Sequence, residues 1–450
     1  MKKEYITLFF LLLLCSCAST IREYPFSPPY AQDPNFYLKE WPLEERLISA
    51  SYQNLLMETF RLHFFNPWLT DTLTLTSEEA NWGVSFIRNV QGYGENKLPC
   101  SSTWIETVIR NANTSEYGKN IWKGINIVRS NLRVLPTIQP FYKDFNKAGE
   151  GFPFDYMQNS ALPVNTPVRI LNQSLDKAWF MVESHHALGW IPCHEICRVD
   201  SMQQAAWMQS ELITPVQEPI TIPDTLGGFI TTARIGALFP RVDSTRTDWL
   251  IGVMMNDGAG QAQIKKGLIR KSEGARQPWP LTLKNTGWLT GALLGQTYGW
   301  GGLFHNRDCS ALIKDFFTPF GVWLPRHSSD QAGMTLFRTD LSGLKPKLKE
   351  QIILKRAIPF LTLFWKPGHI MLYAGVHQKR PMVLHTPWGV VTRHWLGKEG
   401  RYIIGKTVLT SLTPGKDIGV SHLQNTLLDG IDRMTFLVPP DSLRIILPVH

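Results

Sequence analysis

Cysteine is scarce in this chain, which has six in 450 residues, and so few exclude a small scaffold held together by many disulfides. Charged side chains are also sparse, at 18% against about 25% in an average soluble protein. No run of about 18 apolar residues occurs, so no transmembrane helix is expected. Glycine and proline follow no triplet period, which excludes a collagen-like structure.

Apolar residues are plentiful by contrast. They make up 43% of the chain and aromatic residues 11%, which is enough for real cores and too much for a disordered protein. With 450 residues the chain has about three times the length of a typical domain, so several domains are expected. The formal net charge of +9 suits an anionic partner such as nucleic acid, anionic lipid or cell wall.

The N-terminus has the features of an export signal. Two lysines are followed by an apolar run over 6–14 that is too short to span a bilayer, so residues 1–16 are predicted to be a signal peptide. The sequence Leu-Cys-Ser-Cys17 resembles the lipobox of bacterial lipoproteins, which implies cleavage before Cys17 and lipidation of that cysteine. The alternative is an ordinary secretory signal with two incidental cysteines.

Export and lipidation predict a location in the cell envelope. Several acyl chains on Cys17 anchor a protein stably where one would not, so a membrane is an expected partner through this lipid anchor. In a Gram-negative cell, Ala18 after the cysteine implies the outer membrane, facing the periplasm. Nucleic acid is not expected as a partner of an exported protein.

Residues 17–128 are predicted to form a tether and a helical N-terminal stabilising domain. Five prolines and no helical period favour an extended tether over 21–42. Apolar residues recur at helical spacing over 43–65, and Asn66-Pro67 is expected to end that helix. A second helix is predicted over 101–112.

Short β segments replace the helical pattern between about 130 and 210, where proline, glycine and asparagine punctuate them as in a small barrel. The segments are 132–135, 168–171, 179–183 and 188–191. This stretch resembles a bacterial SH3 domain, which is predicted for 129–211. The β-rich block 212–274 resembles a second, more divergent copy, and a proline-punctuated linker follows at 271–281.

Cys193 and Cys197 flank a histidine and a glutamate, a pattern that invites comparison with zinc sites. No second ligand pair lies at a suitable distance, so a disulfide or two structural thiols is expected instead. No metal and no cofactor are predicted for the chain.

A candidate nucleophile lies in the last third of the chain. Apolar residues at helical spacing over 312–320 predict an amphipathic helix that begins at Cys309, with Asp308 as its N-cap. A cysteine at a helix N-terminus meets the positive end of the dipole, which lowers a thiol pKa from about 8.5 toward 7. Since the thiolate is the attacking form, position and chemistry agree at Cys309.

Two histidines supply the base that such a cysteine needs. The segment 366–375 predicts a strand on which His369, Met371 and Tyr373 share one face. The next strand, 382–386, places His385 where it can hydrogen-bond the second nitrogen of His369. That contact would fix the tautomer and orientation of the base, as the third member of a triad does.

Taken together, these motifs resemble the NlpC/p60 family of cell-wall cysteine peptidases. The matching features, in the family's order over about 275–395, are Tyr298-x-Trp300-Gly-Gly, Asp308-Cys309-Ser310, Leu324-Pro-Arg-x-Ser328 with Gln331, Pro-Gly-His369, and His385 with Trp388-Gly389. The SH3 domains and the lipidated N-terminus also look like multi-domain members of this family.

The resemblance implies a multi-domain α+β fold: an N-terminal helical cap, two small SH3-like β-barrels and a papain-like catalytic domain over 275–450. It also implies a γ-D-glutamyl-L-diamino acid endopeptidase, a thiol protease that acts on peptidoglycan stem peptides or muropeptides. In that reaction Cys309 is the nucleophile, His369 the general base and acid, and His385 the orienting residue.

Further roles are implied by the same resemblance. Tyr298 and the Cys309 backbone N–H are expected near the oxyanion, where charge develops in the tetrahedral intermediate. The residues expected to line the substrate groove are Trp300, Asp308, Ser310 and Ser328. Arg307, beside the cysteine, has three readings: a partner of a substrate carboxylate, a partner of Asp308, or a solvated loop charge.

Specificity is predicted from the order of the domains. In family members of this kind the first SH3 domain commonly closes one end of the groove, which implies a substrate with a free N-terminal L-Ala. A buried ammonium needs a carboxylate partner. The segment 154–158 resembles a stretch that faces the active site in such members, which implies that Asp155 pairs with the amine and that Tyr156 packs on the Ala or hydrogen-bonds its amide. The alternative places Asp155 in a solvated turn and Tyr156 in the barrel core.

Two other functions stay open at this stage. One is an N-acetylmuramyl-L-alanine amidase or another Cys-His acyl-transfer enzyme, because a Cys-His-His set serves any acyl transfer. The other is a wall-binding lipoprotein with a degenerate peptidase domain. The presence of all three catalytic residue types argues against the second.

Overall fold

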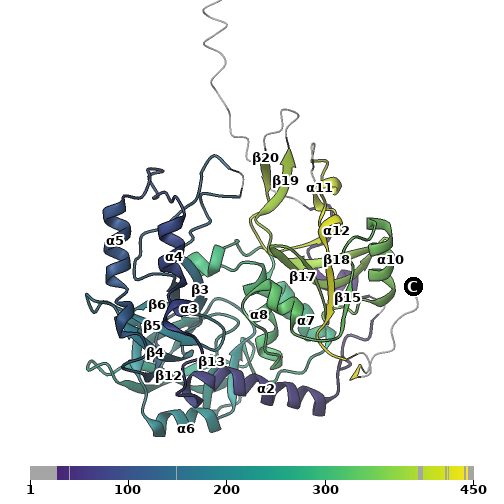
Figure 1. Cartoon of the computed structure of the whole chain (residues 1–450). Coiled ribbons are helices and arrows are strands. Elements are labelled where there is room, and N and C mark those ends of the chain that lie inside the picture. The colour runs from purple at the N-terminus through teal and green to yellow at the C-terminus, as the bar shows by residue number, and fades with distance from the viewer. Residues whose placement is uncertain are drawn as a thin grey trace, which may run out of the picture.

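The structure is a computed structural model that describes residues 28–443 except 40, 148, 394–398, 421, 422, 424, 440 and 441. The predicted signal peptide, 1–16, and the predicted lipidation site, Cys17, lie outside the described residues. No helix within the described part has the length and apolar character that crossing a membrane requires. Figure 1 shows helices and two groups of strands on one side and a mixed α+β domain on the other.

The N-terminal block contains the predicted helices, but the first of them, predicted over 43–65, begins at Ala50 and ends at Leu69. The helical elements are η1 Pro34–Tyr37, α2 Ala50–Leu69, α3 Ser77–Ala80, α4 Trp82–Asn89, α5 Ser102–Asn111 and η2 Thr114–Glu116. Ser49 caps α2 by accepting from the N–H of Tyr52 at 3.1 Å. The prediction that Asn66-Pro67 ends this helix was wrong, because α2 includes Pro67 and Thr70 donates its N–H to the Asn66 carbonyl. A proline in the last turn removes only one of the helix's hydrogen bonds.

Helix α2 joins the N-terminal block to every other part of the molecule. One of its faces buries Phe60, Phe64 and Trp68 in a cluster shared by both groups of strands. Near the start of α2, the buried Gln53 side chain donates to the carbonyl of Trp279 at 2.6 Å and to that of Phe320 at 3.0 Å. The helix therefore fixes the relative positions of the domains.

The tether predicted over 21–42 is packed where the structure describes it, from residue 28. Tyr37 and Leu38 are buried in the core of the C-terminal domain. The amide of Gln32 exchanges two hydrogen bonds with the backbone of Leu409, at 2.9 and 3.0 Å. The absence of a helical period excluded a long helix, but it did not exclude packing.

The first β domain, 122–198, is a seven-stranded antiparallel sheet of order β3-β2-β6-β5-β4-β1-β7. Its strands are β1 Trp122–Asn126, β2 Ser130–Arg133, β3 Gln158–Leu162, β4 Pro167–Gln173, β5 Trp179–Ser184, β6 Leu188–Pro192 and β7 Ile196–Arg198. Four of them match predicted segments. Strand β1 lies before the predicted boundary at 129. The sequence analysis missed it because its five residues, Trp-Lys-Gly-Ile-Asn, are too few to show a clear alternation of apolar and polar residues.

The second β domain, 212–276, follows helix α6 Ser201–Gln209. It has a five-stranded sheet of order β13-β12-β11-β8-β14 and a hairpin of β9 and β10. The strands are β8 Leu212–Pro215, β9 Ile220–Pro223, β10 Phe229–Ala233, β11 Phe239–Ser244, β12 Asp248–Asn256, β13 Ala262–Arg270 and β14 Gly274–Arg276. The β-rich block predicted over 212–274 thus forms a separate β domain.

The C-terminal domain, 281–443, has a six-stranded sheet of order β15-β22-β16-β17-β18-β21. Its strands are β15 Arg338–Asp340, β16 Thr362–Lys366, β17 His369–His377, β18 Arg380–His385, β21 Val408–Ser411 and β22 Arg433–Phe436, with a hairpin of β19 Gly389–Arg393 and β20 Glu399–Ile403. Its helical elements are α7 Leu283–Leu293, η4 Trp300–His305, α8 Cys309–Phe317, η5 Thr318–Phe320, α9 Ser328–Gly333, α10 Pro346–Arg356, α11 Pro414–Asp417 and α12 Leu427–Gly430.

Helix α8 packs against β17 in the largest core of the molecule. It buries Leu312, Ile313, Phe316 and Phe317 there, as its apolar spacing predicts. Strands β17 and β18 pair in a register that places Leu372 opposite Leu384. This register makes His369 and His385 diagonal neighbours on the sheet, which is within reach of long side chains.

Candidate active site

Cys309 is the first residue of α8, and Asp308 caps that helix. The Asp308 carboxylate accepts from the N–H of Ala311 at 2.8 Å and from the Ser310 hydroxyl at 3.1 Å. The arginine at 326 holds the same carboxylate with two hydrogen bonds, of 3.1 and 2.5 Å. Burial would raise the pKa of Asp308, but the Arg326 guanidinium outweighs it, so the pKa lies below its usual value. Asp308 is therefore ionised at the mouth of the helix.

Arg326 ties the first β domain to the helix that carries the cysteine. Besides Asp308, its guanidinium donates to the hydroxyl of Ser310 at 2.7 Å and to that of Ser160, on β3, at 2.9 Å. The side chain of Arg326 is only 5% exposed. Sequence reasoning named the motif in which Arg326 stands but gave the residue no role.

His369 and His385 meet as predicted. Nε2 of His369 lies 2.9 Å from Nδ1 of His385; the His385 ring is buried and that of His369 is partly buried. On its other side, Nε2 of His385 lies 2.9 Å from the hydroxyl of Thr410. Thr410 was not identified from the sequence, because threonine in an apolar strand carries no distinctive signal.

The hydrogen bond of Thr410 fixes the tautomers of both rings. The Thr410 hydroxyl donates to the carbonyl of Ser411 at 2.8 Å, so it accepts from Nε2–H of His385. Nδ1 of His385 is then unprotonated and accepts from Nε2–H of His369. Nδ1 of His369 is therefore the nitrogen left without a proton and is the basic atom of the set.

The Cys309 thiol lies beside this pair, next to the backbone N–H of Ile370, the residue after His369. Burial and the Asp308 carboxylate raise the pKa of the thiol to about 12. Burial and the nearby Lys366 lower the pKa of His369 to about 3. The lowered thiol pKa predicted from the helix dipole was therefore wrong: desolvation and a neighbouring carboxylate outweigh the dipole, and both groups are neutral in the free protein.

Tyr298 lies close enough to Asp308 and Cys309 for their charges to change the pKa of its hydroxyl. Burial raises the pKa of its hydroxyl well above 10, and Asp308 and Cys309 add to that shift. The hydroxyl is therefore protonated and available as a donor. Its ring packs against Trp388 at 5.6 Å between centroids, which fixes the orientation of the phenol.

A groove of about 370 Å³ runs past the cysteine. Three parts of the chain build it: Trp82 comes from α4, Tyr156 from the first β domain and the remainder largely from the C-terminal domain. Of the residues predicted to line a substrate groove, it contains Tyr298, Trp300, Asp308, Ser310 and Ser328, together with Tyr156. Trp82, which is 45% exposed, was not anticipated, because a tryptophan in a helical segment is usually a core residue.

The placement of Asp155 in that groove is corrected by the structure. Its carboxylate is buried and bonds Arg133 at 2.7 Å and the N–H groups of Phe141 and Met157, each at 2.9 Å. It lines a different cavity, with Arg133 and Trp179. Asp155 and Tyr156 stand in a turn that the N–H of Gln158 closes on the Asp155 carbonyl at 3.0 Å, and their side chains line different cavities. Asp155 thus stabilises the first β domain instead of facing the substrate.

Arg307 also differs from all three of its predicted readings. It is buried and bonds Asp315 at 2.6 Å, the carbonyl of Ile235 at 2.7 Å, and both carboxylate oxygens of Glu218. Arg307 therefore connects α8 to the second β domain, on the side of the helix that faces away from the groove.

Cys193 and Cys197 are both free thiols, as are Cys100 and Cys309. Cys193 donates to the carbonyl of Lys177 at 3.1 Å, and Cys197 is buried in the apolar cluster beneath α2. The sequence left open a disulfide or two structural thiols at these positions, and the structure has two unpaired thiols.

Comparison with protein families assigns most of the chain. Residues 6–117 match the NLPC_P60 N-terminal stabilising domain, 140–192 an SH3 domain of the SH3b1 type, 200–246 an SH3 domain of the SH3b2 type, and 295–396 the NlpC/P60 family. These matches follow the order of the N-terminal block, the two β domains and the C-terminal domain. No curated protein matches the chain significantly.

Among solved structures, an NlpC/P60 endopeptidase from Photobacterium damselae subsp. piscicida is similar over nearly its whole length. It is 25% identical, with a TM-score of 0.81, and the match covers 92% of this chain and 99% of that one. An NlpC/P60 family protein from Bacillus cereus ATCC 10987 is 13% identical with a TM-score of 0.46, over 70% of this chain and 100% of that one.

Proposed function

Because the chain belongs to the NlpC/P60 family, a family of cysteine peptidases that hydrolyse peptidoglycan, we propose that it cleaves the γ-D-glutamyl–diamino acid bond of stem peptides. The observation that carries this proposal is the series Thr410–His385–His369 beside a thiol at the start of α8. That series leaves one basic nitrogen on His369 and orients it through two hydrogen bonds, of which the one between His385 and Thr410 is buried.

The neutral thiol and imidazole determine how the reaction begins. Since Cys309 is protonated at rest, His369 takes its proton as the sulfur attacks the carbonyl carbon of the scissile amide. The Cys309 N–H and the protonated Tyr298 hydroxyl stabilise the oxyanion. His369 then gives the proton to the leaving amine, and a water activated by the same nitrogen hydrolyses the thioester.

We propose that the substrate has a free N-terminal L-Ala amine and that Asp308 binds it. Asp308 is the sole carboxylate among the described residues that line the groove. It is ionised. Its oxygens already accept from Arg326, from the Ser310 hydroxyl and from the N–H groups of Gly301 and Ala311, so a substrate ammonium would share or displace one of these donors. Tyr156 and Trp300, whose ring centroids lie 5.8 Å apart, provide an apolar wall for the alanine side chain.

A digest of purified muropeptides analysed by mass tests the cleaved bond. The proposal expects products cut between D-Glu and the diamino acid, and none from the Cys309→Ala protein. A cut between muramic acid and L-Ala would identify an amidase instead, and intact substrate would identify a wall-binding protein.

The amine preference needs a second comparison. Free L-Ala-γ-D-Glu-diamino acid peptide is expected to be cleaved at least tenfold faster, in kcat/KM, than the same peptide attached to muramic acid. Asp308→Asn is expected to remove most of this difference, whereas Asp155→Asn keeps it because Asp155 lies outside the groove. Equal rates on the two peptides would reject the free-amine proposal and leave the cleaved bond unaffected.

We also propose, from the sequence Leu-Cys-Ser-Cys17, that the mature chain is anchored in the cell envelope by lipid. Cys17→Ser is expected to move the protein from the membrane fraction to the soluble periplasmic fraction. A Cys17→Ser protein that still sediments with membranes would contradict the anchor.

A further inference from the structure

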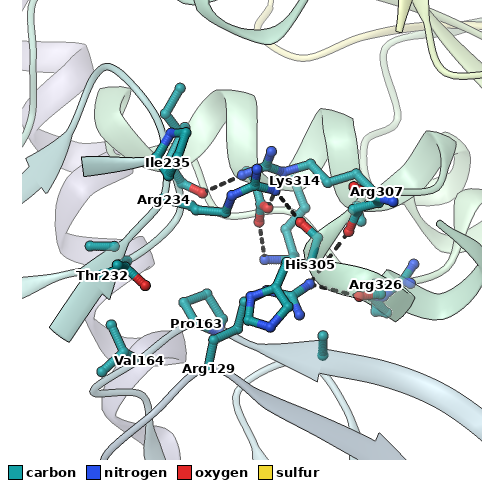
Figure 2. Close-up of a pocket in the computed structure, with 18 residues that line it drawn as sticks. Arg129, Pro163, Val164, Thr232, Arg234, Ile235, His305, Arg307, Lys314 and Arg326 are labelled. Carbon is teal, nitrogen blue, oxygen red and sulfur yellow. Dashed lines mark hydrogen bonds and ion pairs between the residues drawn. The ribbon is translucent and has the colours of Figure 1, made fainter. Parts of the chain in front are cut away.

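A third cavity lies behind the catalytic helix, where the two β domains meet the C-terminal domain (Figure 2). Its volume of about 220 Å³ is many times the roughly 10–15 Å³ that one water needs on this measure. It is separate from the groove, with which it shares Arg326. The exposed residues His305 and Thr232 lie at its edge.

The lining of this cavity is strongly cationic. Its basic residues are Arg129, Arg234, Arg307, Lys314 and Arg326. Carboxylates neutralise the last three: Glu218 and Asp315 pair with Arg307, Asp315 with Lys314, and Asp308 with Arg326.

Arg129 and Arg234 are the two that have no carboxylate partner among the described residues. Arg129 precedes β2 in the first β domain and donates, through Nη2, to the carbonyls of Gly302 and Asn306 at 2.8 and 3.4 Å. Arg234 follows β10 in the second β domain and donates, through Nη1, to the carbonyl of His305. Within the described structure, their other guanidinium nitrogens make no hydrogen bond.

The environment of Arg129 and Arg234 disfavours their positive charges, because both side chains are partly desolvated and lie near the Arg307 guanidinium. Burial, followed by the nearby Arg307 guanidinium, lowers the pKa of Arg129 to about 10. Burial likewise lowers the pKa of Arg234, and both arginines lower that of His305 after burial. Like charges gathered in a partly desolvated cavity are costly unless an anion joins them.

We propose that this cavity binds a small oxyanion, a phosphate or a carboxylate, between the guanidinium groups of Arg129 and Arg234. The free edges of the two guanidiniums supply the paired N–H donors that match oxyanions. Figure 2 shows both side chains reaching into the same space beside His305. Because each arginine comes from a different β domain and each bonds a carbonyl of the C-terminal domain, the anion joins three domains.

Such an anion stabilises the packed arrangement by mass action, because unfolding or domain separation destroys its site. Inorganic phosphate and malonate, each titrated into the purified full-length protein at ionic strength held constant with sodium chloride, are the probes. The expected result is a saturable heat of binding by calorimetry and a saturable rise in Tm of about 2 °C or more with at least one of them.

Two variants at one exposed position supply the control. Thr232→Glu places a carboxylate at the edge of the cavity, where it competes with the anion, while Thr232→Gln has nearly the same size and no charge. Thr232→Glu is expected to abolish binding and Thr232→Gln to retain it. Arg234→Gln is expected to weaken binding at least tenfold, whereas Arg338→Gln, an exposed arginine on β15 far from this lining, leaves it unchanged.

Each outcome of the titrations is informative. Binding of phosphate alone or of malonate alone supports the proposal and identifies the preferred group, and binding of both supports it for either. Absence of binding for both anions, or equal Tm shifts in the wild type and Thr232→Glu, overturns it, since general salt effects act on every variant alike. The measurements do not depend on the peptidase reaction.

Discussion

Thr410 accepts a hydrogen bond from His385 at 2.9 Å, and this contact decides which nitrogen of His385 carries a proton. Because the Thr410 hydroxyl donates its own proton to the Ser411 carbonyl, it can only accept from His385, so Nε2 of His385 carries the proton. The effect passes through His385 to His369, on whose free nitrogen the proposed reaction depends.

Thr410→Val tests this relationship. We expect kcat/KM to fall by about tenfold, or ~1.4 kcal/mol, because the buried Nε2–H of His385 loses its acceptor and both rings lose their fixed tautomers. The fall should lie in kcat and not in KM, since Thr410 is absent from the groove lining. Thr410→Ser keeps the hydroxyl and is expected to keep most of the activity. An equal loss in Thr410→Ser would contradict a role for the hydroxyl.

The three candidate catalytic residues are expected to differ in their importance. Cys309→Ala should abolish hydrolysis while the protein stays folded, because a methyl group replaces a small thiol at a helix start. His369→Ala should be similarly inactive, and His385→Ala should keep residual activity, since an orienting residue contributes less than the base. Purified variants are compared by peptide hydrolysis and by Tm. More than a few per cent activity in Cys309→Ala would remove that residue from the role.

The reactivity of Cys309 toward iodoacetamide is expected to rise with pH without a plateau. Its thiol pKa is raised to about 12 and the pKa of His369 is lowered to about 3, so the reactive thiolate fraction grows about tenfold per pH unit through the neutral range. A preformed thiolate–imidazolium pair would instead react at a constant rate from mildly acidic pH upward, and such a plateau would contradict these pKa directions. Subtraction of the Cys309→Ala rate removes the contribution of Cys100, Cys193 and Cys197.

Arg326→Met should destabilise the protein strongly. The variant leaves the Asp308 carboxylate, whose side chain is 13% exposed, without its cation, and breaking such a buried pair costs about 3–5 kcal/mol. The free energy of unfolding in urea, measured at neutral pH, checks this. The double variant Arg326→Met/Asp308→Asn removes the stranded charge and should recover part of the loss.

The same pair has a pH signature. The pKa of Asp308 is lowered in the folded protein, so its stabilising contribution is present above the unfolded value of about 3.9 and is lost as pH falls through the folded value. The difference between the wild type and Arg326→Met should therefore shrink on acidification. A constant difference down to pH 3 would show that Asp308 is not the group affected.

The sequence predicts the helix of Cys309 and the contact of the two histidines because both depend on local pattern. Apolar spacing places the cysteine at a helix start, and strand alternation with a short turn makes His369 and His385 neighbours. Trp82, Asp155 and Arg307 could not be placed in the same way. Their surroundings come from segments distant in the chain, and no local period indicates whether such a side chain meets solvent, substrate or a buried partner.

The electrostatics of the cysteine show the same limit. The helix dipole is a property of local structure and is visible in the sequence, whereas desolvation by packed domains is not. At Cys309 the second effect, with the Asp308 carboxylate, prevails over the first. Prediction of a pKa thus needs the tertiary environment even where the secondary structure is right.

The N-terminal segment has a practical consequence for anyone dividing this protein. Tyr37, Leu38, Leu47 and Ile48 fill the core of the C-terminal domain although they precede it by more than two hundred residues. A fragment that begins at the linker near 275 would lack these side chains and expose the apolar surface they cover. Expressed alone, it should aggregate, and supplying residues 28–48 as a separate peptide or fused segment should restore its solubility.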